Sequence, residues 1–184
     1  LTFSDSFWFS AVEAEVYAMS SFFTALTFWA ALRWEESNSD YADKWLILIA
    51  YLIGLAIGTH LLNLLVIPAV VFIYYYKYYT RNRKGLIYAF LIGLAILFFV
   101  QKGIIPGIPS LMAKMDLIFV NDIGLPFNSG SIFALLLLIG ATAYGIYYFA
   151  KVKPNHMANL GFICLAYVLL GYSSYAMVVV RSQD

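Results

Sequence analysis

The sequence contains few charged residues. Only 11% of its 184 residues are Asp, Glu, Lys or Arg, whereas 63% are hydrophobic. A water-soluble domain carries about 25% charged residues, so this chain has too few charges to cover a surface that faces water. The same composition excludes an intrinsically disordered chain, which needs low hydrophobicity. Most side chains must therefore face lipid or other membrane helices.

Cysteine and histidine are also scarce. The single Cys164 cannot form an intramolecular disulfide, and we expect it to be a small buried apolar residue. Two histidines and one cysteine, widely separated, do not have the spacing of a metal site, so no metal is expected. A Ser-His-Asp set, a CxxC pair and a glycine-rich phosphate loop are likewise missing. The formal net charge of +1, with basic residues dispersed between apolar runs, argues against nucleic acid as a partner.

No cleavable signal peptide is visible, and the sequence starts with Leu1 instead of methionine. We expect residues 1–184 to form a single transmembrane helical domain that is part of a longer membrane protein.

Long stretches without charge dominate the sequence. A helix needs about 20 apolar residues to cross a membrane, and four stretches fit one crossing each: 16–32, 85–101, 123–150 and 154–180. The fifth stretch, 45–76, is too long for one crossing, and glycines and a proline interrupt it. It predicts either a pair of short helices that turn near Gly58, or one long helix whose tyrosine-rich end lies among the lipid headgroups.

The distribution of Lys and Arg favours the helix pair. Cytoplasmic loops of membrane proteins are enriched in these residues, and four of them crowd the segment 77–84. With a helix pair, more basic residues fall on the side of this segment than with a single long helix. The arrangement predicts about six membrane segments with both chain ends outside. It also predicts an external loop at 102–129 that contains a short helix, 109–119, lying on the membrane.

The N-terminal stretch holds the candidate catalytic residues Asp5, Glu13 and Glu15. Glu13 also has a structural explanation, because Ser10 and Glu13 have the spacing of a capping box at a helix start. Glu15 lies deeper, without a partner three or four residues later. An ionisable group at the edge of the hydrocarbon usually faces a cavity or a partner; a carboxylate that reaches up to water is the alternative.

Three further residues are candidates for binding a substrate: His60, Asn63 and Lys102. A histidine in the predicted turn can donate to a phosphate or a substrate hydroxyl, or it can bond to a backbone carbonyl freed by the glycines. Asn63 shares a helix face with His60, and its alternative role is helix packing. Lys102 can meet an anionic headgroup, although snorkelling to the interface is the simpler explanation.

Three runs resemble a bacterial family of large inner-membrane proteins described as protein O-mannosyltransferase-like. They are FWFSAVEAEVYAM (7–19), GLAIGTHLLNLLVIP (54–68) and GYSSYAMVVVRS (171–182). The family in turn resembles the GT-C superfamily of polytopic glycosyltransferases. The resemblance implies an all-α, GT-C-like transmembrane bundle that contributes the later helices of such an enzyme.

The resemblance also implies a reaction. Its donor would be a polyprenyl-phosphate sugar, with no other cofactor, and its acceptor a Ser or Thr of an envelope protein. The site would face the periplasm from the bacterial inner membrane, in contact with membrane lipid. The carboxylates at 5, 13 and 15 would lie where sugar and acceptor meet, and His60 would contact the departing phosphate.

Two other functions remain open, a transporter or flippase core and a non-catalytic membrane scaffold. A transporter needs ionisable groups at mid-membrane in several helices, and residues 85–101 and 132–150 contain none. The sequence therefore favours the transferase.

Overall fold

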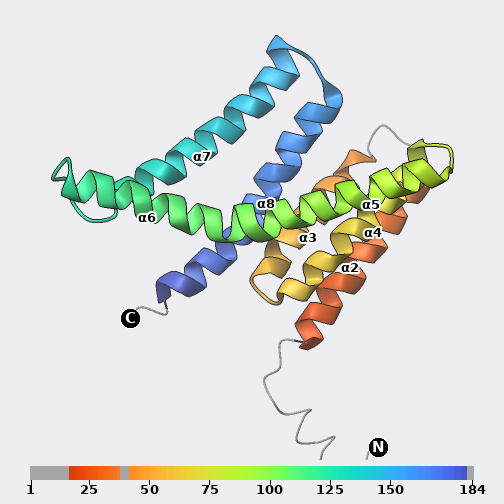
Figure 1. Cartoon of the computed structure of the whole chain (residues 1–184), viewed down its shortest axis with the longest axis horizontal. Helices are drawn as coiled ribbons and strands as arrows, with labels where there is room; N and C mark the ends of the chain where they lie inside the picture. Colours follow the sequence, from red (N-terminus) through yellow and green to blue (C-terminus); the bar gives the residue numbers. More distant parts are fainter. Residues whose placement is uncertain (1–16, 38–41, 182–184) are drawn as a thin grey trace, which may run out of the picture.

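The computed structural model describes residues 17–37 and 42–181, and every regular element in these ranges is helical (Figure 1). The α-helices in chain order are α2 (Tyr17–Glu36), α3 (Asp43–Ile57), α4 (Val66–Tyr78), α5 (Arg83–Phe98), α6 (Ile105–Asn121), α7 (Ser129–Tyr147) and α8 (His156–Arg181). Three short segments of tighter or wider turns connect some of them: η1 (Leu61–Leu65), η2 (Phe99–Ile104) and η3 (Tyr148–Val152). The expected all-α class is confirmed for the described residues.

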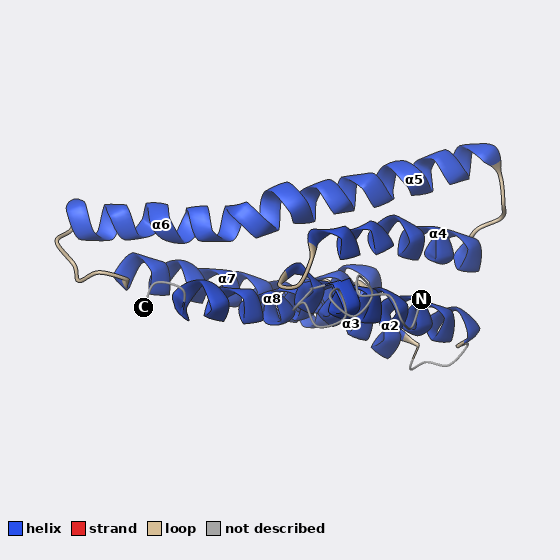
Figure 2. Ribbon diagram, turned by 90° about the horizontal axis from the view of Figure 1, so that it is seen from below, coloured by secondary structure: helices blue, strands red, loops and turns tan. Residues whose placement is uncertain are grey.

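Three helical runs are long and apolar enough to cross a membrane, namely 83–121, 129–152 and 156–175. A shorter apolar helix occupies residues 63–78. These runs support a membrane protein, and the count of about six segments stays a prediction. Figure 2 shows α5 and α6 on one side and α2, α3, α7 and α8 on the other, with α4 between α5 and the helices α2 and α3.

The long apolar stretch at 45–76 forms two helices, as the first of the two alternatives predicts. α3 ends at Ile57, and α4 begins only at Val66. Asn63, just before α4, accepts a hydrogen bond from Ser20 near the start of α2. Lys77, near the end of α4, donates to the carbonyl of Ser37, which lies just beyond the end of α2, at 2.7 Å. α4 therefore runs parallel to α2. α3 runs in the opposite direction, from the end of α2 back to the start of α4 (Figure 1).

The prediction of an external loop at 102–129 is wrong for most of its length, because residues 102–121 are helical. The wide turns of η2 join α5 to α6, so that one helical run of 39 residues extends from Arg83 to Asn121. At 1.5 Å per residue it is about 58 Å long. The loop is limited to residues 122–128, and the expected surface helix at 109–119 lies inside α6.

The long run tolerates Pro109 inside α6 because another helix replaces the missing hydrogen bond. Proline has no N–H, so the carbonyl of Ile105, four residues earlier, loses its usual donor. The hydroxyl of Tyr172 in α8 donates to this carbonyl oxygen at 3.0 Å. Pro106 stands in the first turn of α6, directly after the wide turns of η2.

α3 and α8 cross at a contact between glycines. A Cβ atom on Gly171 would lie 2.6 Å from the carbonyl oxygen of Tyr51, and one on Gly54 would overlap the carbonyl oxygen of Val168. Small residues let helix backbones approach closely in a membrane, where packing drives association. The buried core that includes the neighbouring Tyr172 also contains Ile57, Leu64, Ile67, Val100 and Ile104.

Replacing Gly171 by Ala should destabilise the bundle, because the added methyl group overlaps the backbone of α3. Overpacking of this kind costs about 1–3 kcal/mol. Gly161→Ala on the same helix is the matched control, since a Cβ there has no atom within 4 Å. Thermal unfolding in detergent should give a lower midpoint for Gly171→Ala and an equal or slightly higher one for Gly161→Ala, because alanine favours a helix more than glycine; equal midpoints for the two variants would contradict the close approach.

Candidate functional site

Polar side chains gather where α3 ends and α2 begins. Ser20, Thr24, Thr59, His60 and Asn63 lie there, and we refer to them as the Asn63 cluster. They come from the first turns of α2, from the turn that separates α3 from η1, and, for Asn63, from η1 itself. Two of the predicted substrate-binding residues therefore lie together in this cluster.

Asn63 is 4% exposed, and three hydroxyl groups surround its side chain. Its Oδ1 accepts from Ser20 Oγ at 2.6 Å and from Thr24 Oγ1 at 2.9 Å. Its Nδ2 donates to Thr59 Oγ1 at 3.1 Å. These bonds join η1 to α2, so the geometry fits the packing role that the sequence left open for Asn63.

Thr59 terminates α3. Its hydroxyl donates to the carbonyl of Ala56 at 2.9 Å, and the backbone N–H groups of Thr59 and His60 both donate to the same carbonyl. The last turn of a helix leaves carbonyls without donors, and in an apolar environment each of these is costly. The hydroxyl and the two amides satisfy one of them where the chain leaves the helix.

His60 is half-buried, and its imidazole lies against the first described residue of α2. The ring centroids of His60 and Tyr17 are 5.6 Å apart, with the planes tilted by 42°. Asp5, Glu13 and Glu15 lie outside the described residues. Glu15 is only two residues before Tyr17 in the sequence, so the histidine stands beside the point where the carboxylate-bearing segment joins α2.

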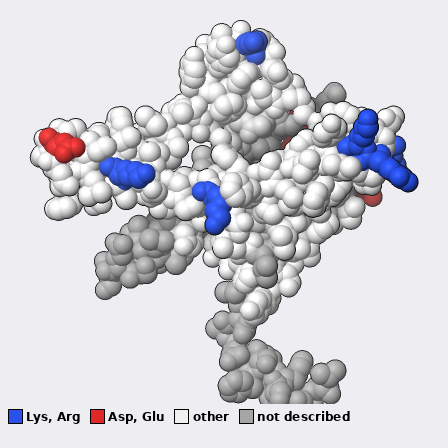
Figure 3. Space-filling model, in the orientation of Figure 1, with Lys and Arg blue, Asp and Glu red and all other residues white. Residues whose placement is uncertain are grey.

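Lys102 is set apart from the cluster. It is exposed in η2, whereas Val100 and Ile104 in the same segment are buried in the core with Leu64. Residues two positions apart point to different sides of a helix, so the ammonium group lies on the outer side of a segment that packs against η1. Figure 3 shows a basic side chain on the surface where α5 passes into α6.

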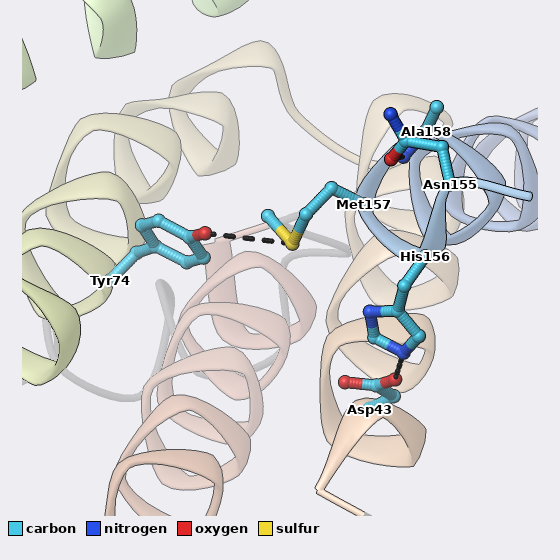
Figure 4. A network of polar contacts seen from close by, with 6 residues as sticks. All are labelled: Asp43, Tyr74, Asn155, His156, Met157 and Ala158. Carbon is cyan, nitrogen blue, oxygen red and sulfur yellow. Dashed lines mark hydrogen bonds and ion pairs between the residues drawn. The ribbon is translucent and has the colours of Figure 1, made fainter.

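The second histidine marks the opposite end of the bundle. His156 Nε2 lies 2.8 Å from Asp43 Oδ2, so that the start of α8 is joined to the start of α3 (Figure 4). Beside this pair, the hydroxyl of Tyr74 lies 3.8 Å from the sulfur of Met157. The His156 side chain is 72% exposed.

Basic side chains line this same end. Arg33 and Lys44 lie over the ring of Trp45, at 5.9 Å and 5.6 Å from its centroid. Lys77 lies 4.6 Å above the ring of Trp34 and also donates to the carbonyl oxygen of that residue. The Asn63 cluster and this group of cations are therefore at opposite ends of the bundle.

Sequence reasoning did not single out the three hydroxyl residues that hold Asn63. Ser20 and Thr24 are four residues apart in an apolar stretch, which places both on one face of a helix. This spacing is a signal that would have located a polar partner for α2. The chain reversal at 58–65 brings Asn63 to this face of α2 and so determines which residue is the partner.

Residues 1–84 match the family model of the protein O-mannosyl-transferase TMEM260 N-terminal domain. No curated protein and no solved structure matches the chain. The matched residues cover α2, α3, η1 and α4, and hence the whole Asn63 cluster, whereas α5 to α8 follow the match, apart from the first two residues of α5. The match supports a resemblance to the O-mannosyltransferase-like family and a glycosyltransferase-type role.

Replacing Asn63 by Leu should destabilise the protein, because the hydroxyls of Ser20 and Thr24 lose their buried acceptor. A buried polar group without a partner costs about 1–3 kcal/mol. Adding Ser20→Ala and Thr24→Val to the Leu variant should restore part of the loss, since replacing both partners by apolar groups is nearly neutral. Thermal unfolding of the single and combined variants tests this; strictly additive losses would show that the three side chains are not coupled.

Proposed function

We propose that this chain is part of a membrane glycosyltransferase that moves a sugar from a polyprenyl-phosphate donor to a Ser or Thr hydroxyl of an acceptor protein. The family match supports the transferase role. The observation that supports the finer proposal is the position of the His60 ring, 5.6 Å from the ring of Tyr17 and so beside the start of α2. Glu15, the candidate base, is two residues before Tyr17.

The reaction needs two groups on opposite sides of the sugar carbon. The acceptor hydroxyl forms a bond to the anomeric carbon, and the bond from that carbon to the phosphate oxygen breaks. A carboxylate takes the hydroxyl proton as a general base, and we assign this role to Glu15, with Asp5 and Glu13 as the other acidic candidates. The polyprenyl phosphate leaves with the electron pair, and a positioned donor stabilises its charge.

His60 is our candidate for that donor. Its neighbour Asn63 is a positioning residue, because its bonds to α2 fix the turn that carries the imidazole. Lys102, on the outer side of η2, would add positive charge for the phosphate of an approaching donor lipid. Leu61 and Leu65, which are 47% and 60% exposed beside His60, offer an apolar surface for the polyprenyl chain.

The proposed orientation places the Asn63 cluster on the external side of a bacterial inner membrane. Lys and Arg are enriched on the cytoplasmic side of membrane proteins, and the end of the bundle with His156 and Lys77 carries the cations described above. A donor sugar on the external side would then meet the cluster at the same face as an envelope protein.

Replacing Glu15 by Gln in the full-length protein should lower transfer of tritiated mannose from polyprenyl-phosphate mannose to a Ser/Thr acceptor by about 100-fold or more, because general-base catalysis contributes about that much. His60→Ala should lower it by about 100-fold through loss of the phosphate donor. The matched controls at the other end of the bundle are Glu36→Gln and His156→Ala, which should keep transfer near the wild-type level.

Full transfer by a membrane-inserted Glu15→Gln protein would remove Glu15 from the site. Absence of transfer by the wild-type protein, with the donor and a range of acceptors supplied, would contradict the transferase and favour the scaffold or the transporter.

The orientation predicts opposite labelling of two loops. In a Cys164→Ala background, a cysteine at Phe127, which is 82% exposed, should react with an impermeant maleimide in intact cells. A cysteine at Ser39 should react only after permeabilisation. Reversed labelling would overturn the orientation, and labelling of both in intact cells would overturn the helix arrangement as well.

A further inference from the structure

The turn between α4 and α5 borders an open cavity of about 530 Å³, at the opposite end of the bundle from the Asn63 cluster. Tyr75, Tyr79 and Tyr88 line it, together with Arg83 and Lys84, whose side chains carry positive charge. Tyr79 and Tyr88 are 59% and 64% exposed. Nothing in the proposed transfer reaction uses this cavity.

Hydrogen bonds to Tyr75 hold the backbone of the turn in place. Tyr75 is 8% exposed, and its hydroxyl donates to the carbonyl of Thr80 at 2.8 Å and accepts from the N–H of Asn82 at 3.1 Å. The Asn82 side chain in turn accepts from the N–H of Gly85 at 2.5 Å. A Cβ on Gly85 would overlap the Tyr75 hydroxyl. The backbone of the turn that borders the cavity is therefore held in place by these bonds, which lowers the cost of ordering it when a ligand binds.

The charge of the cavity has one sign. Arg83 and Lys84 are cationic, and the lining contains no carboxylate. The other cavity near this end, of about 410 Å³, differs because Asp43 and His156 both line it and pair with each other. Of these two cavities, the first is the one suited to an anion.

An apolar stripe continues from the cavity along α5. Lys84, Ile87, Leu91 and Leu94 follow one another at intervals of three or four residues, so they share one face of the helix. Ile87, Leu91 and Leu94 are 58%, 53% and 40% exposed. α5 begins the run 83–121 that is long and apolar enough to cross a membrane. Tyrosine rings beside such an end are typical of the membrane–water interface.

We propose that this cavity binds the phosphate group of an anionic membrane lipid, with an acyl or polyprenyl chain along the apolar stripe of α5. Arg83 and Lys84 would contact the phosphate, and the tyrosine rings would enclose the glycerol or the first carbons of the chain. Basic residues next to a membrane helix attract anionic lipid headgroups in general. Beyond this general attraction, the cavity beside the turn would hold one lipid at a defined position.

Native mass spectrometry of the full chain in neutral detergent tests this proposal. The probes are phosphatidylglycerol, polyprenyl phosphate, phosphatidylcholine and the soluble headgroup glycerol phosphate. Phosphatidylglycerol or polyprenyl phosphate should occupy the wild-type protein at least about five-fold more than phosphatidylcholine, because each of the two cations attracts an anionic headgroup. The preferred anionic lipid identifies the source of the phosphate.

Two variants locate the bound lipid. Arg83→Gln with Lys84→Gln should abolish the preference, whereas Lys151→Gln with Lys153→Gln, the same charge change at the α7–α8 turn, should keep it. Thr80→Trp fills the cavity without changing any charge, and it should also abolish the preference. Unfolding midpoints near the wild-type value establish that each variant is folded.

Three results would overturn the proposal. Equal losses in the two double variants would mean diffuse attraction to all cations. A full preference in Thr80→Trp would place the lipid outside the cavity. Binding of glycerol phosphate as tight as that of the lipids would mean that the site takes a soluble phosphate ester and needs no chain.

Discussion

A backbone carbonyl without a donor is costly in an apolar environment, and this constraint accounts for the side-chain hydrogen bonds found where a described helix ends or loses a backbone donor. Where α3 stops, the Thr59 hydroxyl and two amides satisfy the carbonyl of Ala56. Where Pro109 removes a donor within α6, the Tyr172 hydroxyl replaces it. Beyond α2, Lys77 donates to the carbonyl of Ser37. Several of the few polar groups of this chain are thus used to close backbone gaps.

The same constraint bears on how a polar residue in such a protein is interpreted. Asn63 is buried and bonded to three hydroxyls, so holding the turn against α2 is a sufficient reason for its presence. His60 is different, since its half-buried ring lies at the edge of the cluster beside Tyr17. A rigid turn that carries an ionisable ring at its edge is a suitable support for a site. The proposed roles follow this division, with Asn63 as the positioning residue and His60 as the group that meets the phosphate.

Composition and charge spacing were enough to predict a helical membrane protein and the division of 45–76 into two helices, because hydropathy, helix-breaking residues and the distribution of Lys and Arg are all visible in the sequence. The continuity of α5 and α6 was not predictable in the same way. Pro106, Gly107 and Pro109 read locally as a loop, and the donor that stabilises the helix there comes from Tyr172, 67 positions away. The partners of Asn63 were not predicted for a similar reason, since Ser20 and Thr24 are about 40 residues away in the sequence. In both cases the structure depends on hydrogen bonds between residues that are far apart in the sequence.

The crossing of α3 and α8 makes the matched segment depend on the rest of the chain. Residues 1–84 contain Ile57, Leu64 and Ile67 of the buried core, whereas Val100, Ile104 and Tyr172 come from beyond the match. In a membrane, lipid can cover an apolar side chain, so burial alone does not hold helices together. The backbone contact at Gly54 and Gly171 supplies close packing that lipid chains do not reproduce. Loss of α8 would remove this contact and the support of the turn that carries His60, so the candidate site depends on helices that the family match does not include.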